Sequence, residues 1–316
     1  MQIVHALEQR LTDRPTILTI GKFDGVHFGH QRLVCATVER AQTLGYLSAV
    51  LTFEPHPDVV IRPERELYLL TNLEERSELI AALNPDLLIV APFTQETMST
   101  PPDTYMRQIC TALPLRELYV GTDFALGRKR EGDVARLRTI GQELGYTVTT
   151  VDPVKIGETT VSASRVRQLL YAGDVQGVIP LLGRPFWVRG EVIVGDRRGH
   201  TIGYPTANLA IAPVHALPSN GVYACYAYIT DVPLPAVTNI GTRPTFDGTR
   251  RTVEVHLLDW SGDLYGQQLR LEFLHHLRGE QKFSSVAELV AQIGRDADRA
   301  RNLLRDASPG PPVSGP

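Results

Sequence analysis

Two histidines lie three residues apart in one glycine-rich stretch, Gly21-Lys22-Phe23-Asp24-Gly25-Val26-His27-Phe28-Gly29-His30. If the stretch opens a helix, His27 and His30 share one face and can donate hydrogen bonds to the same group. A helix start also presents unpaired backbone N–H groups, and glycine lets an anion approach the backbone closely. The stretch therefore predicts a phosphate-binding turn; the alternative is an ordinary turn with two solvated histidines.

The stretch places no candidate covalent nucleophile beside the two histidines. Such a site suits direct attack of one phosphate on the α-phosphorus of ATP, with pyrophosphate leaving. The protein would act by positioning the reactants and neutralising charge, with a divalent metal assisting. We therefore expect nucleotidyl transfer at this turn.

A second glycine-rich stretch, residues 190–208, ends in Gly203-Tyr204-Pro205-Thr206-Ala207-Asn208. Proline disfavours a helical conformation in the residue before it, so the end of this stretch is predicted to be extended. In an extended chain Thr206 and Asn208 project from one face. A hydroxyl and an amide oxygen suit Mg²⁺ when phosphates and water complete the octahedron. The alternative is a structural turn between two strands.

A single carboxylate lies within a predicted strand further along the chain. Glu254 alternates with Val253 and Val255, so its side chain faces away from their apolar side. A glutamate at such a position is usually solvated. The chain lacks the G-x-x-x-x-G-K-[ST] pattern, so a kinase built here would bind phosphates without the common P-loop.

The first half of the chain alternates between strand and helix patterns, which predicts a parallel sheet covered by helices. Strands are expected at 16–20, 49–53, 87–90, 118–120 and 147–151, and helices at 31–44, 73–83, 104–113 and 134–144. Two more helices are expected between Ser162 and Leu182, split at 172–174. The histidine stretch follows the first strand, at the sheet edge where such folds bind ligands.

From Val188 onward, short strand patterns alternate with Gly/Pro turns, which predicts a small antiparallel barrel. Strands are expected at 192–194, 222–229, 236–239, 253–258 and 269–273. Ser285 and Glu288 have the spacing of a capping box for a final helix. We place the domain boundary at 183/184, with domains 1–183 and 184–306 and a disordered Pro/Gly-rich tail at 307–316.

Composition narrows the function classes. A chain of 316 residues suggests two globular domains, and 32 Lys+Arg against 35 Asp+Glu disfavour a nucleic-acid partner. Three widely spaced cysteines oppose a disulfide framework or a CxxC metal site. The N-terminus has no signal-peptide pattern and no apolar run reaches about 18 residues, so we expect a cytoplasmic protein without membrane contact.

The two motif sets together resemble the bacterial bifunctional riboflavin kinase/FAD synthetase family, whose second activity is FMN adenylyltransferase. The histidine stretch is similar to the HxGH nucleotidyltransferase superfamily, and residues 52–57, 120–124 and 161–167 are similar to its FAD synthetase branch. Similarity to riboflavin kinase is carried by residues 203–208, 221–224, 239–245, 253–259, 263–266 and 278–283.

This resemblance implies a Rossmann-like α/β domain followed by a riboflavin-kinase barrel with a terminal helix. It implies ATP-dependent phosphorylation of riboflavin to FMN, then adenylylation of FMN by ATP to give FAD and pyrophosphate. Mg²⁺ is the implied cofactor and ATP the co-substrate, with no tightly bound prosthetic group. Riboflavin, FMN, FAD and ATP are the implied partners, while the oligomeric state stays open.

The resemblance also implies roles for individual residues. His27, His30 and Glu254 would be catalytic, with Glu254 accepting or orienting the proton of the ribityl 5′-hydroxyl. Nucleotide or phosphate binding is implied for Gly21, Phe23, Asp24, Gly25, Gly29, Ser162, Ser164, Arg165, Gly195, Gly199 and Gly203. Flavin binding is implied for Pro55, His56, Pro57, Asp123, Phe124 and Arg278, and metal binding for Thr206 and Asn208.

One segment departs from the family pattern. The usual I-S-S-T-x-I-R is Val-Ser-Ala-Ser-Arg-Val-Arg at 161–167, so Ala163 lacks a hydroxyl and Ser164 replaces a threonine. Ser162 has an alternative role as a simple helix cap. Two other functions stay open. One is a different HxGH transferase that acts on another phosphorylated small molecule or on an amino acid for tRNA charging; the missing K-M-S-K-S segment and the acidic balance oppose only the tRNA version. The other is a flavin-binding or regulatory protein in which one or both sites have decayed, with Ala163 as the first sign.

Overall fold

The computed structural model describes residues 1–305 except 8, 65, 196–202, 231 and 246–247. Within it the chain forms two compact units that divide after Ser162. This division precedes two helices that the sequence assigns to the first domain, so the expected domain limits stay a prediction. The expected tail at 307–316 lies outside the described residues.

A six-stranded parallel sheet forms the centre of the first unit, in the order β1-β4-β3-β2-β5-β8. Its strands are β1 (Gln2–Val4), β2 (Thr16–Ile20), β3 (Leu47–Glu54), β4 (Leu87–Pro92), β5 (Leu115–Gly121) and β8 (Thr147–Val151). The expected parallel sheet is confirmed, and β1 is an additional edge strand. The order reverses at β2, and ligands of open α/β sheets bind at such a point, at the carboxyl ends of the strands.

Helices cover both faces of this sheet. The longer ones are α1 (Phe28–Leu44), α3 (Leu73–Ala81), α5 (Pro102–Ala112) and α6 (Val134–Leu144). Short elements between them are η1 (Asp24–Val26), α2 (Pro57–Ile61), α4 (Gln95–Ser99), β6 (Ala125–Leu126), η2 (Arg128–Arg130), β7 (Gly132–Asp133), β9 (Lys155–Ile156) and β10 (Thr159–Thr160). Helix α1 begins three residues earlier than expected, so its first turn contains His30.

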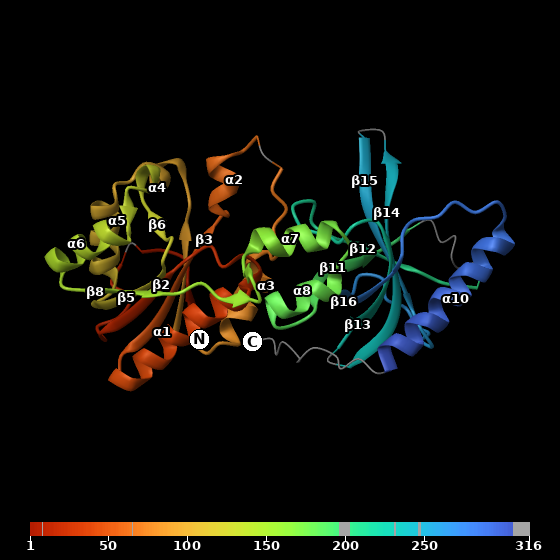
Figure 1. The fold of residues 1–316 in the computed structure, drawn as a ribbon, viewed down its shortest axis with the longest axis horizontal. Coiled ribbons are helices and arrows are strands. Elements are labelled where there is room, and N and C mark those ends of the chain that lie inside the picture. Colours follow the sequence, from red (N-terminus) through yellow and green to blue (C-terminus); the bar gives the residue numbers. More distant parts are fainter. Residues whose placement is uncertain (8, 65, 196–202, 231, 246–247, 306–316) are drawn as a thin grey trace. The chain divides into compact units, whose positions relative to one another are not determined.

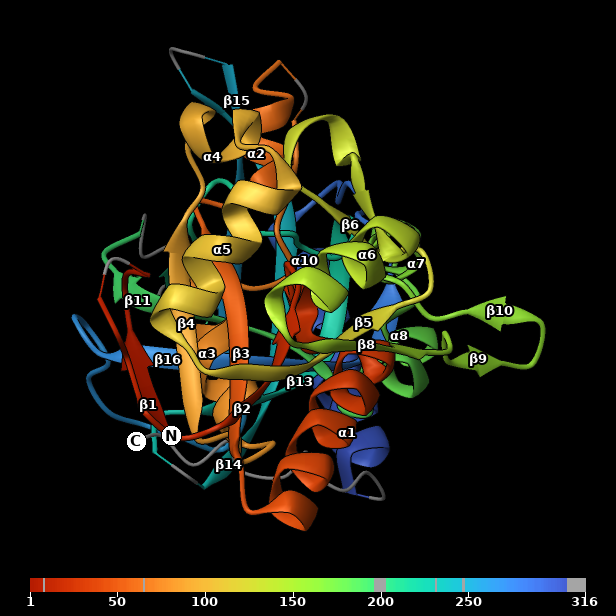
Figure 2. The ribbon, with the colours of Figure 1, turned by 90° about the vertical axis from the view of Figure 1, so that its left-hand side faces the viewer.

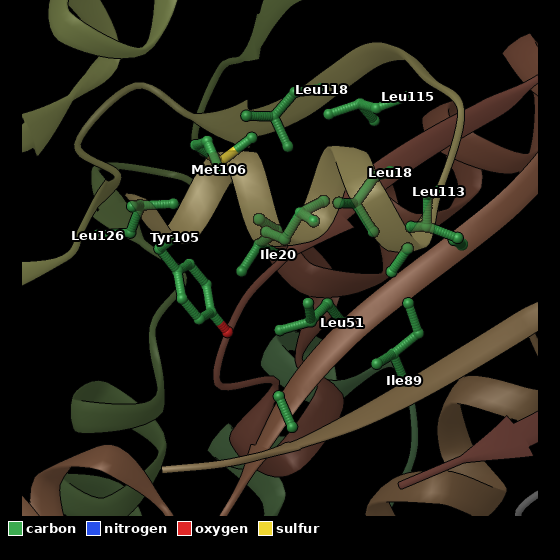
Figure 3. Close-up of a cluster of buried hydrophobic side chains, with 14 of the residues drawn as sticks. Leu18, Ile20, Leu51, Ile89, Tyr105, Met106, Leu113, Leu115, Leu118 and Leu126 are labelled. Carbon is green, nitrogen blue, oxygen red and sulfur yellow. The ribbon is translucent and has the colours of Figure 1, made fainter. Parts of the chain in front are cut away.

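The core explains why β2 can hold the histidine stretch rigidly. All five residues of β2 are buried, as expected for a parallel strand covered on both faces. Helix α5 lies across one face of the sheet (Figure 2), and its Tyr105 and Met106 pack with Leu18 and Ile20 of β2 (Figure 3). On α1, Leu33, Thr37 and Ala41 are buried, whereas Leu44 at its C-terminal end is exposed.

The second unit contains a closed barrel in the order β11-β12-β15-β14-β13-β16, with every neighbouring pair antiparallel (Figure 1). The strands are β11 (Phe186–Ile193), β12 (Ala207–Ala210), β13 (Gly221–Tyr228), β14 (Pro233–Thr245), β15 (Gly248–Leu257) and β16 (Gln268–Arg278). The expected antiparallel barrel is confirmed. Strand β12 was expected only as an extended stretch, because its four residues carry too short a pattern.

In the described part of the second unit, helices α7 (Ala163–Tyr171), α8 (Val175–Leu182) and α10 (Val286–Arg305) accompany the barrel. Helices α7 and α8 are split at 172–174 as expected, and α10 is the terminal helix. The Ser285 hydroxyl accepts from the Glu288 N–H at 3.2 Å, but the Glu288 carboxylate accepts from the Ser284 N–H at 2.9 Å. Only one of the two hydrogen bonds of the expected capping box forms, because the Glu288 carboxylate accepts from the N–H of Ser284 and not from that of Ser285.

Two candidate active sites

The turn after β2 has an unusual backbone. Phe23, Gly25 and Val26 have φ values of 50°, 73° and 39°. Positive φ is disfavoured for residues other than glycine and is an outlier for a β-branched residue such as valine. Phe23 and Val26 are both buried, so packing of their side chains holds this conformation. A Cβ atom at Gly21 would lie 3.0 Å from Cζ of Phe23, so glycine lets that ring fold back over the chain.

A loop before α3 fastens this turn. The buried Asp24 carboxylate accepts hydrogen bonds from the N–H groups of Leu70 and Thr71, at 2.9 and 3.1 Å. The Gly25 N–H donates to Oγ1 of Thr71 at 3.0 Å, and a Cβ at Gly25 would lie 2.8 Å from Cδ1 of Leu70. Asp24 and Gly25 therefore shape the turn, and their expected contacts with a nucleotide stay a prediction.

The structure brings the two histidine side chains together. The imidazole rings of His27 and His30 stack with centroids 3.6 Å apart and planes at 18°. His27 is the N-cap of α1: its Nδ1 accepts from the His30 N–H at 3.4 Å, which leaves Nε2 as the N–H donor of a neutral ring. A Cβ at Gly29 would lie 3.2 Å from Cε1 of His27, so glycine makes room for that ring.

The pair is set into the protein, with His27 buried and His30 half-buried. His27 is 8% exposed, and the Nδ1 atom of His30 is buried without a hydrogen-bond partner in the described part of the chain. Burial, and then the nearby His27, hold the pKa of His30 well below its ordinary value, so that ring is neutral at pH 7. A buried ring nitrogen without a partner is rare in folded proteins and suits a ligand atom as its partner.

The expected flavin segment follows β3, the neighbour of β2 in the sheet. Pro55 is exposed, whereas His56 and Pro57 are buried at the start of α2. Nδ1 of His56 accepts from the Asp58 N–H at 3.2 Å, and Lys22 forms an ion pair with Asp58 at 2.6 Å. These contacts join the segment to the histidine stretch, and flavin binding by it stays a prediction.

Strand register assembles the candidate site of the barrel. Asn208 in β12 lies opposite Glu254 in β15, and Glu254 lies opposite Asn239 in β14. Directly paired residues of antiparallel strands project from the same face, so these three side chains form a polar row. Val253 and Val255 are buried on the other face, as the alternation predicts.

The Glu254 carboxylate has a fixed partner. Its Oε1 accepts a hydrogen bond from Nη2 of Arg243, and the two side chains are 21% and 38% exposed. A charge-assisted hydrogen bond of this kind holds a carboxylate in one orientation. Sequence reasoning assigned no role to Arg243 or Asn239, although both lie in the segment 239–245 that carried the family resemblance.

The expected metal ligands lie at the start of β12. Thr206 precedes the strand by one residue and Asn208 is its second residue; both are half-buried. No group of three His, Cys, Asp or Glu side chains in the described ranges could hold a metal ion. A hydroxyl and an amide oxygen still fit Mg²⁺, which binds few protein ligands when substrate phosphates are present.

Two described glycines lie between β11 and β12, near these ligands in the sequence. A Cβ at Gly195 would overlap the side-chain amide of Asn208, and Gly203 has φ of 82°. Nδ1 of His256 lies 2.8 Å from the carbonyl oxygen of Pro205, which fixes the end of the loop to β15. Gly199, expected to bind phosphate, lies outside the described residues.

Family models match both halves of the chain. The FAD synthetase model matches residues 9–165 and the riboflavin kinase model residues 182–304. The bifunctional riboflavin kinase/FMN adenylyltransferase of Escherichia coli (strain K12) is 36% identical over 303 residues, which are 95% of this chain and 96% of that protein. This chain belongs to the bifunctional riboflavin kinase/FMN adenylyltransferase family. The Bacillus subtilis (strain 168) member is 34% identical, over 90% of this chain and 91% of its own.

One solved structure shares the whole fold. It is described as a macrolide-efflux protein from Streptococcus pneumoniae and is 28% identical, with a TM-score of 0.87 over 95% of this chain and 98% of its own. Within the described residues of the present chain, every helix is too short or too polar to span a bilayer.

Two further segments of the family pattern lie at other places in the fold. Asp123 and Phe124 follow β5, so they share the carboxyl edge of the sheet with the histidine stretch. The carbonyl oxygen of Asp123 accepts from Arg130 at 2.9 Å, and Phe124 packs against the sheet core. Asp123 is exposed at that edge, and flavin binding by these residues stays a prediction.

The serine and arginine segment lies at the division between the two units. Ser162 directly precedes α7, in the position of its N-cap, while Ser164 and Arg165 are exposed in its first turn. Nη1 of Arg165 donates to Oε1 of Gln168 at 3.3 Å. Because Ser164 and Arg165 belong to the second unit, their roles beside the two histidines stay predictions.

Arg278, at the end of β16, was expected to contact flavin. Its Nη2 and Nε atoms both lie 2.9 Å from Oδ2 of the buried Asp296 in α10. The ion pair fastens the terminal helix to the barrel. Flavin binding by Arg278 would use guanidinium N–H groups that do not contact Asp296. This role stays a prediction.

Proposed function

We propose that the two family activities are divided between the two units. This enzyme phosphorylates riboflavin to FMN and adenylylates FMN to FAD, with ATP as the co-substrate of both reactions. The second unit would carry the kinase and the first unit the adenylyltransferase. The alignment of Asn208, Glu254 and Asn239 across three strands carries this assignment, because it puts a carboxylate beside suitable metal ligands.

In the kinase reaction, Glu254 accepts the proton of the ribityl 5′-hydroxyl while that oxygen attacks the γ-phosphorus of ATP. The new O–P bond forms as the bond to ADP breaks, which is the chemistry of phosphoryl transfer. Arg243 keeps the carboxylate in one orientation. Thr206 and Asn208 would hold Mg²⁺, which supplies positive charge to the phosphate oxygens when bound.

In the adenylyl transfer, a phosphate oxygen of FMN attacks the α-phosphorus of ATP and pyrophosphate leaves. His27 and His30 donate hydrogen bonds to phosphate oxygens whose charge rises in the transition state. The packed turn between residues 21 and 30 holds these donors in place before the substrates bind, so little reorganisation accompanies the reaction.

We also propose that the enzyme works in the cytoplasm. Its three cysteines, Cys35, Cys110 and Cys225, are all free thiols, which suits a reducing compartment. Its partners are then riboflavin, FMN, FAD and ATP, and we propose no nucleic-acid or membrane partner.

The test separates the two reactions by the bond of ATP that each one breaks. The purified full chain should convert riboflavin with ATP and Mg²⁺ to FMN and then FAD, resolved by chromatography, and a chelator should stop FMN formation. An ATP analogue with an uncleavable β–γ bridge should still give FAD from FMN but no FMN from riboflavin. An α–β analogue should show the opposite pattern. A chain that binds flavin without turnover, or adenylylates another phosphorylated compound instead, would contradict the proposal.

A further inference from the structure

A completely buried arginine contacts the end of β3, directly before the expected flavin segment. Arg76, in α3, is 1% exposed, and its Nη2 atom donates to the carbonyl oxygen of Phe53 and to Oε2 of Glu54, both at 2.9 Å. Its Nε atom is buried without a partner in the described part of the chain. Neither the sequence motifs nor the proposed chemistry uses this side chain.

Stability alone gives a poor account of an arginine at this position. Burying a guanidinium is costly, and an ion pair offsets that cost only when its geometry and its remaining hydrogen bonds are good. Here the Glu54 side chain is 42% exposed and one guanidinium N–H group is unsatisfied. Apolar residues often replace such buried pairs without loss of stability.

The contacts of Arg76 show what it holds. Phe53 and Glu54 are the last two residues of β3, directly before Pro55, His56 and Pro57 of the expected flavin segment. Arg76 therefore fixes the direction in which the chain leaves the sheet. The neighbouring strand β2 leads into the histidine stretch in the same way.

Residues shortly before Arg76 contact the histidine stretch at 21–30. Residues 70 and 71 provide the N–H groups that bind the Asp24 carboxylate. Directly after them, Asn72 and Glu75 form a reciprocal capping box at the start of α3, with both hydrogen bonds at 2.9 Å. Arg76 is the next residue, so the segment 70–76 contacts both motif turns through a rigid helix start.

We propose that Arg76 is a positioning residue of the adenylyltransferase site, which sets the flavin-side turn at 54–57 against the phosphate-side turn at 21–30. The inference rests on the proposed function of the first unit. Misplacement of a bound group by about 1 Å can lower a rate on the order of 100-fold, so a small shift of this turn is measurable.

The test variant is Arg76→Met, which keeps a long side chain and removes the charge. We expect the KM for FMN to rise on the order of 10-fold to 100-fold, with the KM for ATP and the kinase rate within about twofold of wild type. Arg76→Lys should recover most of the loss, because both hydrogen bonds come from one nitrogen that an ammonium can replace. A merely structural arginine would not separate the two KM values.

A matched control is Arg40→Met, which removes an arginine whose side chain is 43% exposed and which forms a bidentate ion pair with Glu117 in the same unit. Ion pairs with an exposed partner contribute little to stability, so this variant should keep the wild-type KM values for FMN and for ATP. Glu54→Gln alone should raise the KM for FMN. In the Arg76→Met background it should have no further effect, because the contact between the two side chains is already lost.

The outcomes separate this inference from the proposed function. His27→Ala with undiminished FAD formation would refute the proposed function. If His27→Ala loses FAD formation while Arg76→Met keeps a wild-type KM for FMN, only the positioning role fails. If Arg76→Met does not fold, Glu54→Gln decides: an unchanged KM for FMN overturns the inference, and a selective rise in that KM supports it.

Discussion

The two candidate sites are built in different ways. In the first unit, ten consecutive residues from Gly21 to His30 supply the histidines, the glycines and the helix start. In the barrel, Asn208, Glu254 and Asn239 come from three strands and meet only through their pairing. A local site depends on backbone conformation, whereas a site made by register depends on how distant segments align.

This difference decides what damages each site. The turn tolerates changes elsewhere as long as the residues packed around Phe23 and Val26 hold it. The barrel row is sensitive to pairing, because a shift by one residue would turn Glu254 to the face of Val253 and Val255. Variants and fragments can therefore probe the two kinds of site separately.

The largest expected effect comes from separating the units. A fragment of residues 163–306 should fold and form FMN but no FAD, whereas residues 184–306 alone should lose most of their stability. Helix α8 contacts β11 and β16 and has four buried residues, Val175, Val178, Leu181 and Leu182. Burial of each contributes about 1.5–3 kcal/mol, and a whole domain is stable by only about 5–15 kcal/mol.

Circular dichroism, urea melts and flavin chromatography on both fragments test this prediction. Equal stability of the two fragments would show that α7 and α8 contribute nothing to the barrel. A folded longer fragment that makes FAD would contradict the division of activities.

The next largest effect concerns the barrel row. Glu254→Gln keeps the size of the side chain and removes the proton acceptor, so kcat for FMN formation should fall by roughly 10² to 10⁴ with little change in KM. Adenylylation of supplied FMN should be unaffected. Steady-state kinetics of both reactions on one preparation measure the difference.

A matched control is Glu191→Gln, an exposed glutamate in β11 of the same barrel, which should keep wild-type kinetics. Thermal melts exclude a general loss of structure. A well-folded Glu254→Gln enzyme with near-normal kcat would end the assignment of Glu254 as the proton acceptor.

A reciprocal pair of variants sharpens the comparison. His27→Ala should lower FAD formation on the order of 10² to 10³ and leave the kinase near normal, because one donor to the transition state is lost. Asn208→Ala should suppress FMN formation and spare adenylylation. His27→Asn separates chemistry from capping, since asparagine is also a good N-cap. Equal damage to both reactions by either change would argue against two sites.

The smallest expected effect is a dependence of stability on pH. His30 is held neutral in the folded protein, while its unfolded pKa is about 6.5. Below pH 6.5 the unfolded chain binds a proton that the folded chain does not, so stability falls as the pH falls, by at most about 1.4 kcal/mol per pH unit. Above pH 6.5 His30 is neutral in both states, so its titration no longer lowers the free energy of unfolding.

Urea melts at pH 7.5 and 5.5 should show this loss in the wild type. His30→Gln should show a smaller difference between the two pH values, because it removes the titrating group that stacks on His27. An identical pH dependence in both proteins would mean that protonation of His30 is not linked to folding.

Local patterns in the sequence predicted much of the fold. The limits of β2, β8 and α6 agree with the expected ranges, since β2 and α6 have apolar patterns and β8 consists only of β-branched residues. The three-residue spacing of the histidines predicted their convergence, and the alternation around Glu254 predicted its face. These features depend only on neighbouring residues.

Long-range features could not be predicted in this way. Arg243 and Asn239 lie near Glu254 because β14 pairs with β15 in one register, which no local pattern encodes. No pattern distinguished the buried Arg76 from the other residues of the helix expected at 73–83. No local pattern predicted that the Asp24 carboxylate binds the N–H groups of Leu70 and Thr71, and its expected contact with nucleotide stays a prediction.

The hydrogen bond between the Gly25 N–H and the Thr71 hydroxyl has a consequence for the order of events during protein synthesis. The two residues are separated by 46 positions in the chain, and the turn is conformationally disfavoured without the contacts that this loop makes. When residues 21–30 first emerge from the ribosome, residues 70 and 71, which stabilise the turn, have therefore not yet emerged. We expect the nascent chain to carry an open, unformed turn until β3 and the start of α3 have emerged, so that nucleotide binding begins only then.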